Sequence, residues 1–217
     1  MDEKRLSQEI RRLGLGPLRY FPSLDSTNSE AARWAADGAA DGALVLADAQ
    51  TAGRGRLGRQ WYTAPASALA FTLILRPSEV GEFTWYAGLG ALAVCSALRQ
   101  GYDLSAEIKW PNDVLLAGKK IAGVLVEARW NGSELDSLLV GIGVNVGRDS
   151  LPPEGWNAPD APAAIPSAAV EQFLNVALER ETLLLAILAR LVEWRARLGR
   201  PEFLQAWQEH LAWQGEW

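Results

Sequence analysis

Residues 113–146 read DVLLAGKKIAGVLVEARWNGSELDSLLVGIGVNV, and this stretch decides the fold. Its apolar and β-branched residues predict strands at 113–117, 120–129 and 135–146. The first two strands are joined by Ala117-Gly118-Lys119-Lys120, a turn sequence typical of a hairpin. Because a hairpin joins antiparallel strands, the stretch predicts an antiparallel sheet.

The flanking sequence adds helices and further strands. Thr27 and Glu30 have the spacing of a capping box, which predicts the start of a helix. A Pro-rich loop from Leu151 to Pro166 separates the sheet region from a C-terminal helical segment. In full, the sequence predicts helices at 3–13, 27–38, 83–100 and 167–198, and further strands at 18–21, 43–49, 68–76 and 105–109. The fold class is therefore α+β, with a mixed, mainly antiparallel sheet packed against helices on one face.

Size and composition indicate one domain, alone or with a small appendage, because 217 residues with 49% hydrophobic content can bury a sizeable core. Lys and Arg number 21 against 26 Asp and Glu, and the net charge of −5 opposes nonspecific binding to nucleic acid. The lone cysteine, Cys95, lies in an apolar run and is expected in the core. The N-terminus lacks an apolar leader and no run of about 18 apolar residues occurs, so we expect a cytoplasmic protein without a membrane span.

A single histidine, His210, restricts the chemistry. This excludes a catalytic triad with a histidine elsewhere in the chain, and it excludes a zinc site with several histidines. We expect His210 to be a surface or helix-capping residue. A reaction on this chain would use Lys, Arg, Asp, Asn and an external metal, which favours transfer chemistry driven by positioning and charge stabilisation.

The sequence GRGRLGR at 53–59, followed by Gln60-Trp61, predicts a loop that binds an anion. Its glycines fit G-x-G-x-x-G, but Gly58 leads into an aromatic and Pro-containing segment where a dinucleotide-binding fold would begin a helix. A phosphate-binding P-loop is excluded, since no Gly-Lys-Ser/Thr follows. A solvated basic turn that binds nothing remains the alternative.

Two further blocks carry polar residues suited to phosphate or metal chemistry. Lys109-Trp110-Pro111-Asn112-Asp113 places Lys, Asn and Asp at a corner after a strand, and the Asn and Asp oxygens suit Mg²⁺; an ordinary turn is the alternative. Lys120 and Gly123 follow on the next strand. Asn145 is a polar residue in an apolar run and must find a metal, a phosphate or a backbone group as its partner.

Together these motifs resemble the biotin protein ligases of the monofunctional type, which lack an N-terminal DNA-binding domain. The resemblance rests on Asp25-Ser26-Thr27-Asn28, the block from Gln50 to Arg59, Lys109 to Asp113 with Lys120 to Gly123, and Gly141 to Asn145. It implies a catalytic domain related to class II synthetases. It also implies activation of biotin by ATP to biotinyl-5′-AMP and pyrophosphate, followed by transfer of biotin to a lysine of a biotin carboxyl carrier domain.

The resemblance also implies roles for individual residues. Biotin would be bound by Ser26, Thr27, Asn28, Gln50, Gly53, Arg54, Gly55, Arg56, Lys120 and Gly123. ATP and the adenylate would be bound by Arg54, Arg56, Trp61, Lys109, Asn112, Lys120 and Asn145, and Mg²⁺ would be held near Asn112, Asp113 and Asn145. The expected catalytic set is Arg54, Arg56, Lys109, Asp113 and Lys120, with Asp113 orienting or deprotonating the carrier amine.

The chain departs from the family at both ends. Residues 1–24 are too few for a winged-helix module, so no specific DNA binding is expected. Residues 1–205 are expected to form the catalytic domain, and 206–217 the start of an SH3-like domain that is otherwise missing. A homodimer is possible on the family pattern. The alternatives are a lipoate or octanoyl ligase on the same fold and a noncatalytic biotin-binding module.

Overall fold

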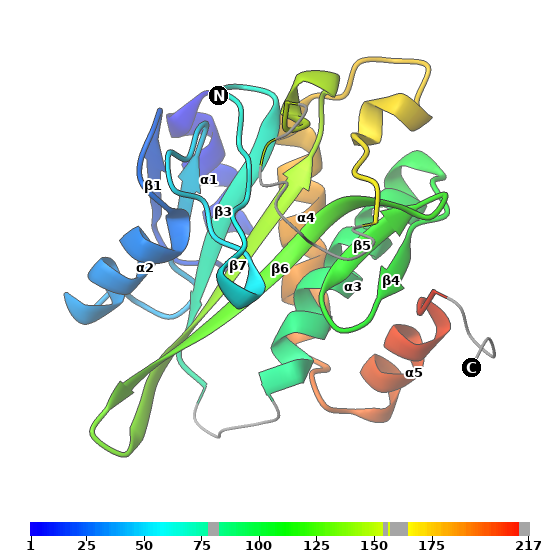
Figure 1. Cartoon of the computed structure of the whole chain (residues 1–217). Helices are drawn as coiled ribbons and strands as arrows, with labels where there is room; N and C mark the ends of the chain where they lie inside the picture. The colour runs from blue at the N-terminus through cyan, green and yellow to red at the C-terminus, as the bar shows by residue number, and fades with distance from the viewer. Residues whose placement is uncertain (78–82, 154–155, 157–164, 213–217) are drawn as a thin grey trace.

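The computed structural model describes residues 1–77, 83–153, 156 and 165–212, and its centre is one seven-stranded sheet (Figure 1). The strand order is β1-β2-β3-β7-β6-β5-β4. β1 and β2 pair in parallel, and the other neighbours pair antiparallel. The strands are β1 Leu18–Phe21, β2 Leu44–Ala47, β3 Ala68–Leu75, β4 Glu107–Lys109, β5 Asp113–Leu116, β6 Lys119–Asn131 and β7 Glu134–Asn145. The predicted mixed, mainly antiparallel sheet is confirmed.

The helices cover both faces of this sheet. They are α1 Glu3–Arg12, α2 Thr27–Ala36, α3 Phe83–Tyr102, α4 Arg180–Arg195 and α5 Pro201–Glu209. The large core joins α1, α3 and α4 to one face, and a smaller core packs α2 against Val45, Ile74 and Leu139. Val45 and Ile74 point away from their neighbours Leu44 and Leu73, which lie in the large core, because successive strand residues face opposite sides. The expectation of helices on one face is therefore wrong for α2.

Apolar spacing explains why α3 and α4 lie against the sheet. In α4, Leu183, Leu184, Ile187, Leu188 and Leu191 are buried, and this spacing forms one apolar stripe along the helix. α3 is buried at almost every residue from Tyr86 to Leu98, because it packs both against the sheet and against α4. Cys95 lies within this layer as expected, and burial raises the pKa of its thiol.

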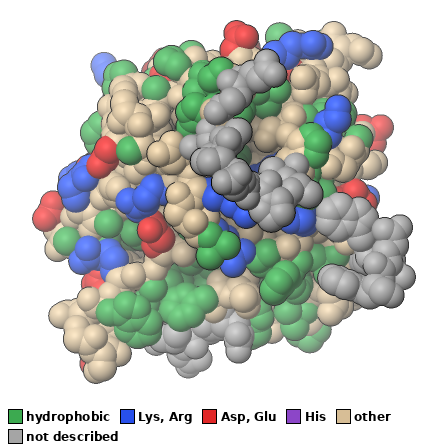
Figure 2. Space-filling model, viewed as in Figure 1, with side chains coloured by type: hydrophobic (Ala, Val, Ile, Leu, Met, Phe, Trp, Pro, Cys, Tyr) green, Lys and Arg blue, Asp and Glu red, His purple; other side chains and the backbone are tan. Residues whose placement is uncertain are grey.

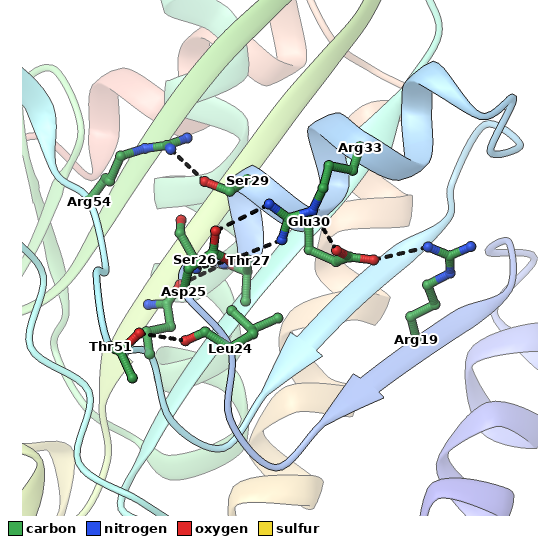
Figure 3. Close-up of polar contacts among 11 residues, drawn as sticks. Arg19, Leu24, Asp25, Ser26, Thr27, Ser29, Glu30, Arg33, Thr51 and Arg54 are labelled. Atoms are coloured by element: carbon green, nitrogen blue, oxygen red, sulfur yellow. Dashed lines mark hydrogen bonds and ion pairs between the residues drawn. The ribbon is translucent and has the colours of Figure 1, made fainter.

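The predicted capping box at the start of α2 is wrong. Ser26 is the N-cap, Thr27 is the first helical residue, and the Ser26 side chain makes no capping hydrogen bond. Glu30 instead pairs with Arg19 and Arg33, each at 2.9 Å (Figure 3). The Glu30 carboxylate thus bonds to two guanidinium groups, whereas in a capping box it would accept from the backbone N–H of the N-cap residue.

The predicted helix at 167–198 is correct only from residue 180. The Lys120 N–H donates to the Pro166 carbonyl and the Ala168 N–H donates to the Lys120 carbonyl, both at 2.8 Å. Residues 166–168 therefore run extended beside the start of β6, and a short 3₁₀ turn, Val170–Phe173, follows. Pairing with β6 determines the conformation here, and local helical preference does not.

The C-terminal described residues pack on the sheet edge. The boundary expected at residue 205 lies inside α5, which continues to Glu209. The Ile108 N–H donates to the His210 carbonyl at 2.7 Å, and the Ala212 N–H donates to the Ile108 carbonyl at 2.9 Å. His210 is the C-cap of α5, as predicted. Residues 213–217 lie outside the described residues, and no helix among those described is long and apolar enough to cross a membrane.

Candidate functional site

A cavity of about 270 Å³ lies on the sheet face that carries α2. Its walls are the N-terminus of α2, the loop that follows β2, and strands β5, β6 and β7. All the predicted site residues line it except Gly53 and Asn145. The lining also includes residues that the sequence prediction did not assign: Leu57, Arg59, Gln60, Trp110, Pro111, Val124, Leu125, Gly141, Ile142 and Gly143.

One end of the cavity is neutral and rich in hydroxyl and amide groups. Gln50 Oε1 accepts from the Thr27 N–H at 2.8 Å and from the Thr27 hydroxyl at 3.1 Å, and Gln50 Nε2 donates to the Thr63 hydroxyl at 3.1 Å. The Ser26 side chain is 3% exposed, and its hydroxyl bonds to no other described residue. This end therefore offers a free hydroxyl beside an ordered amide.

Asp25 fixes the backbone that carries Ser26. Its carboxylate accepts from the Ser26 N–H at 2.7 Å and from both Nη atoms of Arg33, at 3.0 and 3.1 Å (Figure 3). The Arg33 guanidinium lowers the pKa of the Asp25 carboxyl group. Asp25 thus stays ionised and holds the first turn of α2 at the cavity wall.

Asn28 is buried beside the same end, and its amide is fully engaged by the protein. Its Oδ1 accepts from the buried Thr72 hydroxyl at 2.6 Å, and its Nδ2 donates to Glu127 at 2.7 Å. Asn28 also lies against Gly141, where an added Cβ would approach Asn28 Cγ to 2.9 Å. Its geometry is that of a residue that supports the cavity wall, since both the oxygen and the nitrogen of the amide already bond to the protein.

Trp61 lies on two glycines that pair across β6 and β7. Gly123 is opposite Gly143, and a Cβ on Gly143 would lie 2.6 Å from Trp61 Nε1. A Cβ on Gly123 would lie 3.2 Å from Trp61 Cζ3. The missing side chains thus make room for the indole, which lines the middle of the cavity. Trp61 Nε1 is buried without a hydrogen-bond partner among the described residues.

The loop at 53–61 folds back on itself and carries three arginines. The Trp61 N–H donates to the Gly53 carbonyl at 2.8 Å, and the Gly55 N–H donates to the Arg59 carbonyl at 2.7 Å. Arg54 does not point at an open anion site: its Nη atoms contact the Ser29 hydroxyl and the Glu127 carboxylate, both at 2.6 Å, and Figure 3 shows the Ser29 contact. The charge of Arg54 is therefore already balanced by Glu127.

The other end of the cavity is cationic. Arg56 Nη1 donates to the neutral Asn112 amide oxygen at 3.0 Å, so its charge is not balanced there. Lys120 pairs with Asp113 at 2.8 Å, whereas the side chains of Lys109 and Arg59 have no ionic partner among the described residues. Figure 2 shows Lys and Arg side chains gathered near the middle of this face. Unbalanced guanidinium and ammonium groups in a cavity attract anions.

The residues expected to hold Mg²⁺ do not form a metal site. Asn112 Oδ1 accepts from Arg56, and Asp113 is paired with Lys120. Asn145 lies outside the cavity lining, and its Nδ2 donates to the Ala168 carbonyl at 3.2 Å. Within the described ranges no three His, Cys, Asp or Glu side chains gather as metal ligands. The three residues therefore do not come together as the expected site, because Asn145 bonds to a backbone carbonyl elsewhere and a lysine already pairs with the one carboxylate.

Comparison with known proteins finds relatives of one family. Residues 20–145 match the family model described as the biotin/lipoate A/B protein ligase family. The biotin–[acetyl-CoA-carboxylase] ligase of Paracoccus denitrificans is 38% identical over 203 residues, covering 88% of this chain and 80% of that protein. The bifunctional ligase/repressor BirA of Bacillus subtilis is 37% identical over 149 residues, and the match spans about half of it (46%) and 65% of this chain.

A solved structure shows the same architecture. The biotin protein ligase of Aquifex aeolicus in complex with biotin and ATP aligns with a TM-score of 0.68 and 29% identity, covering 89% of this chain and 72% of that chain. The matched region of the family model contains the whole of the cavity lining. The cavity thus lies within the part of the chain that the family model matches.

Proposed function

Because the chain belongs to the biotin/lipoate A/B protein ligase family, we propose that it is an ATP-dependent biotin protein ligase. It would form biotinyl-5′-AMP and pyrophosphate from biotin and ATP, and would then pass the biotinyl group to a lysine of a biotin carboxyl carrier domain. The observation that carries this proposal is the polarity of one cavity: a neutral hydroxyl and amide end, an aromatic middle and a cationic end.

The neutral end suits the ureido ring of biotin. That ring has one carbonyl acceptor and two N–H donors, and hydroxyl groups can both donate and accept. The unpaired Ser26 hydroxyl can donate to the carbonyl, and the Thr27 hydroxyl, which donates to Gln50, keeps its lone pairs for a ring N–H. Asn28 acts from behind this wall, since its amide already bonds Thr72 and Glu127.

The cationic end suits the two anions that react. The biotin carboxylate must attack the α-phosphorus of ATP, and mutual repulsion opposes their approach. Arg56, Arg59 and Lys109 can neutralise carboxylate and phosphate oxygens without first breaking an ion pair with another described side chain, and Lys120 can join them by turning from Asp113. A P–O bond forms to the biotin carboxylate as the bond to pyrophosphate breaks.

The aromatic middle and the loop would protect the product. Biotinyl-5′-AMP is a mixed anhydride, and its acyl carbon must meet an amine before it meets water. Trp61 is held on the sheet floor by the loop at 53–61, which covers the cavity. In the transfer step the carrier amine would attack the acyl carbon and AMP would leave, and Asp113, which lines the cavity, would orient the amine or take its proton.

The test is a reaction of the purified chain with biotin, ATP, Mg²⁺ and a biotin carboxyl carrier domain. We expect biotin-dependent exchange of pyrophosphate into ATP, and a mass gain of one biotinyl group on the carrier. Arg5→Ala, at an exposed residue of α1 on the opposite face of the sheet from the cavity, is the control that should leave both rates unchanged. Exchange that depends on lipoate alone would reject the proposal, and biotin binding without any adenylate would show a noncatalytic module.

A further inference from the structure

Glu127 is an acidic side chain beside the cavity to which the motifs of the sequence assign no role. It lies on β6, four residues after Gly123, and alternation along the strand places Gly123, Leu125 and Glu127 on the same face. Gly123 and Leu125 line the cavity, and Glu127 is the next residue beyond its neutral end. One oxygen of Glu127 accepts from both Arg54 Nη2, at 2.6 Å, and Asn28 Nδ2, at 2.7 Å.

We propose that Glu127 is a positioning residue that latches the loop at 53–61 over the cavity and fixes the amide of Asn28. The ligand consequences rest on the proposed function as a biotin ligase. The latch itself is a property of the chain without ligand.

The first half of the latch is the orientation of Asn28. An ionised carboxylate can only accept hydrogen bonds, so the amide nitrogen must face Glu127 and the amide oxygen must face the Thr72 hydroxyl. Asn28 occupies the space that a side chain at position 141 would need, since an added Cβ there would lie 2.9 Å from Asn28 Cγ. Removing Glu127 leaves a buried amide donor with only the distant Leu125 carbonyl, at 3.4 Å, so the cavity wall loses its fixed orientation.

The second half is the attachment of the loop. Arg54 joins the loop to Glu127 on β6 and to Ser29 on α2, two elements on either side of the neutral end. Within the loop, the hydrogen bonds of Gly55 with Arg59 and of Trp61 with Gly53 connect Arg54 to the indole on the sheet floor. Loss of the Arg54 anchor therefore frees Trp61 as well as the arginines.

The strength of the latch follows from its exposure. The Arg54 and Glu127 side chains are 41% and 37% exposed, so solvent screens their attraction. An ion pair of this kind changes a local equilibrium by about fivefold at most. This suits a loop that must open for substrates and close over the adenylate on each turnover.

The direct test is amide hydrogen exchange in the loop without any ligand. We expect Glu127→Ala and Arg54→Ala each to speed exchange at Gly55 and Trp61 by about fivefold, with the double variant no faster than either single one. The control is Asp41→Asn, which breaks an ion pair with Arg195 of similar exposure, 44% and 31%, remote from the cavity. Unchanged loop exchange in Glu127→Ala, or additive effects in the double variant, would overturn the latch.

A second measurement separates the two halves and guards against a folding defect. Glu127→Gln keeps an oxygen for Asn28 but removes the charge that holds Arg54. We expect it to speed loop exchange and the escape of biotinyl-5′-AMP into solution while KM for biotin stays close to that of the parent chain. Glu127→Ala should also raise KM for biotin. A general loss of kcat with unchanged KM and unchanged adenylate escape in both variants would contradict a positioning role.

The two proposals fail in different ways. If the parent chain makes no adenylate, the proposed function is rejected while the exchange experiment still decides whether the latch exists. If the adenylate forms but the loop exchanges at the same rate in every variant, the function stands and the latch is rejected.

Discussion

Replacing Gly143 by alanine tests the geometry of the cavity floor most sharply. Gly143 lies in the middle of the sheet, paired with Ala70 of β3 on one side and Gly123 of β6 on the other. A Cβ at this position would lie 2.6 Å from Trp61 Nε1 and 2.7 Å from Trp61 Cζ2. Ordinary contacts between such atoms are about 3.5–4.0 Å, so the indole must withdraw by about 1 Å.

The size of the effect follows from which part can move. Strand β7 is held by hydrogen bonds on both sides, whereas Trp61 belongs to a loop whose ties to the sheet are few. Overpacking a site of this kind costs about 1–3 kcal/mol. Because the loop can leave the floor, the cost should fall on ligand binding and not on unfolding. At about 2 kcal/mol, the affinity for biotin falls roughly thirtyfold.

The assay is titration calorimetry with biotin, run beside thermal unfolding of the same samples. Gly123→Ala is a graded comparison, since its Cβ would meet Trp61 at 3.2 Å and should cost much less. Gly101→Ala is the control, with no atom within 4 Å of the added Cβ. The reasoning is refuted if Gly123→Ala is as damaging as Gly143→Ala. It is also refuted if Gly143→Ala causes the same further loss in a Trp61→Ala background, where nothing remains to collide with.

Two further predictions concern Lys120 and Tyr20. Lys120→Ala should lower biotin-dependent pyrophosphate exchange by about a hundredfold, because a cation facing the developing charge is lost, whereas exposed Lys119→Ala should not; equal rates would remove Lys120 from the active site. Burial, with a hydrogen bond to Asp48, raises the pKa of Tyr20 to about 12. Unfolded tyrosine ionises near pH 10, so between pH 10 and 12 the folded chain keeps a proton that the unfolded chain loses. The free energy of unfolding should therefore fall as the pH rises over this range, and it should fall less steeply in Tyr20→Phe. Urea unfolding at several pH values measures both slopes, and identical slopes in the two chains would contradict the prediction.

The sheet was predictable because its signals are local. Alternating and continuous apolar runs mark β3, β6 and β7, and the turn at Ala117-Gly118 fixes the β5–β6 hairpin. Other features depend on distant partners. The sequence around 166–168 is compatible with a helix start, and its extended form arises from hydrogen bonds to Lys120. The position of α2 on the opposite face depends on which face of β2 and β3 it meets, which its own sequence does not state.

The candidate site shows the same division. The motifs supply most of the lining, from the first turn of α2, the loop at 53–61 and the strands β5, β6 and β7. The partner of Arg54 could not be read from its motif, since Glu127 is 73 positions away and meets it only in the folded sheet. The alternation of Gly123, Leu125 and Glu127 does carry a signal, because it puts an acidic residue on the face that two cavity residues share. Asn145 was expected to bond to a metal, a phosphate or a backbone group, and it donates to a backbone carbonyl.

The cavity is proposed to bind anions, yet its lining includes the carboxylate of Asp113, which would repel them. Arg56, Arg59, Lys109 and Lys120 all line one small space, and like charges brought together this way repel one another. Asp113 takes up the charge of Lys120 at 2.8 Å, which lowers the cost of keeping the cationic end assembled when no substrate is present. If the chain is the proposed ligase, an entering carboxylate or phosphate group would compete with Asp113 for the same ammonium, and the aspartate would be released near the reacting atoms. On that proposal, Asp113 would become available as the base of the transfer step only when the cavity is filled.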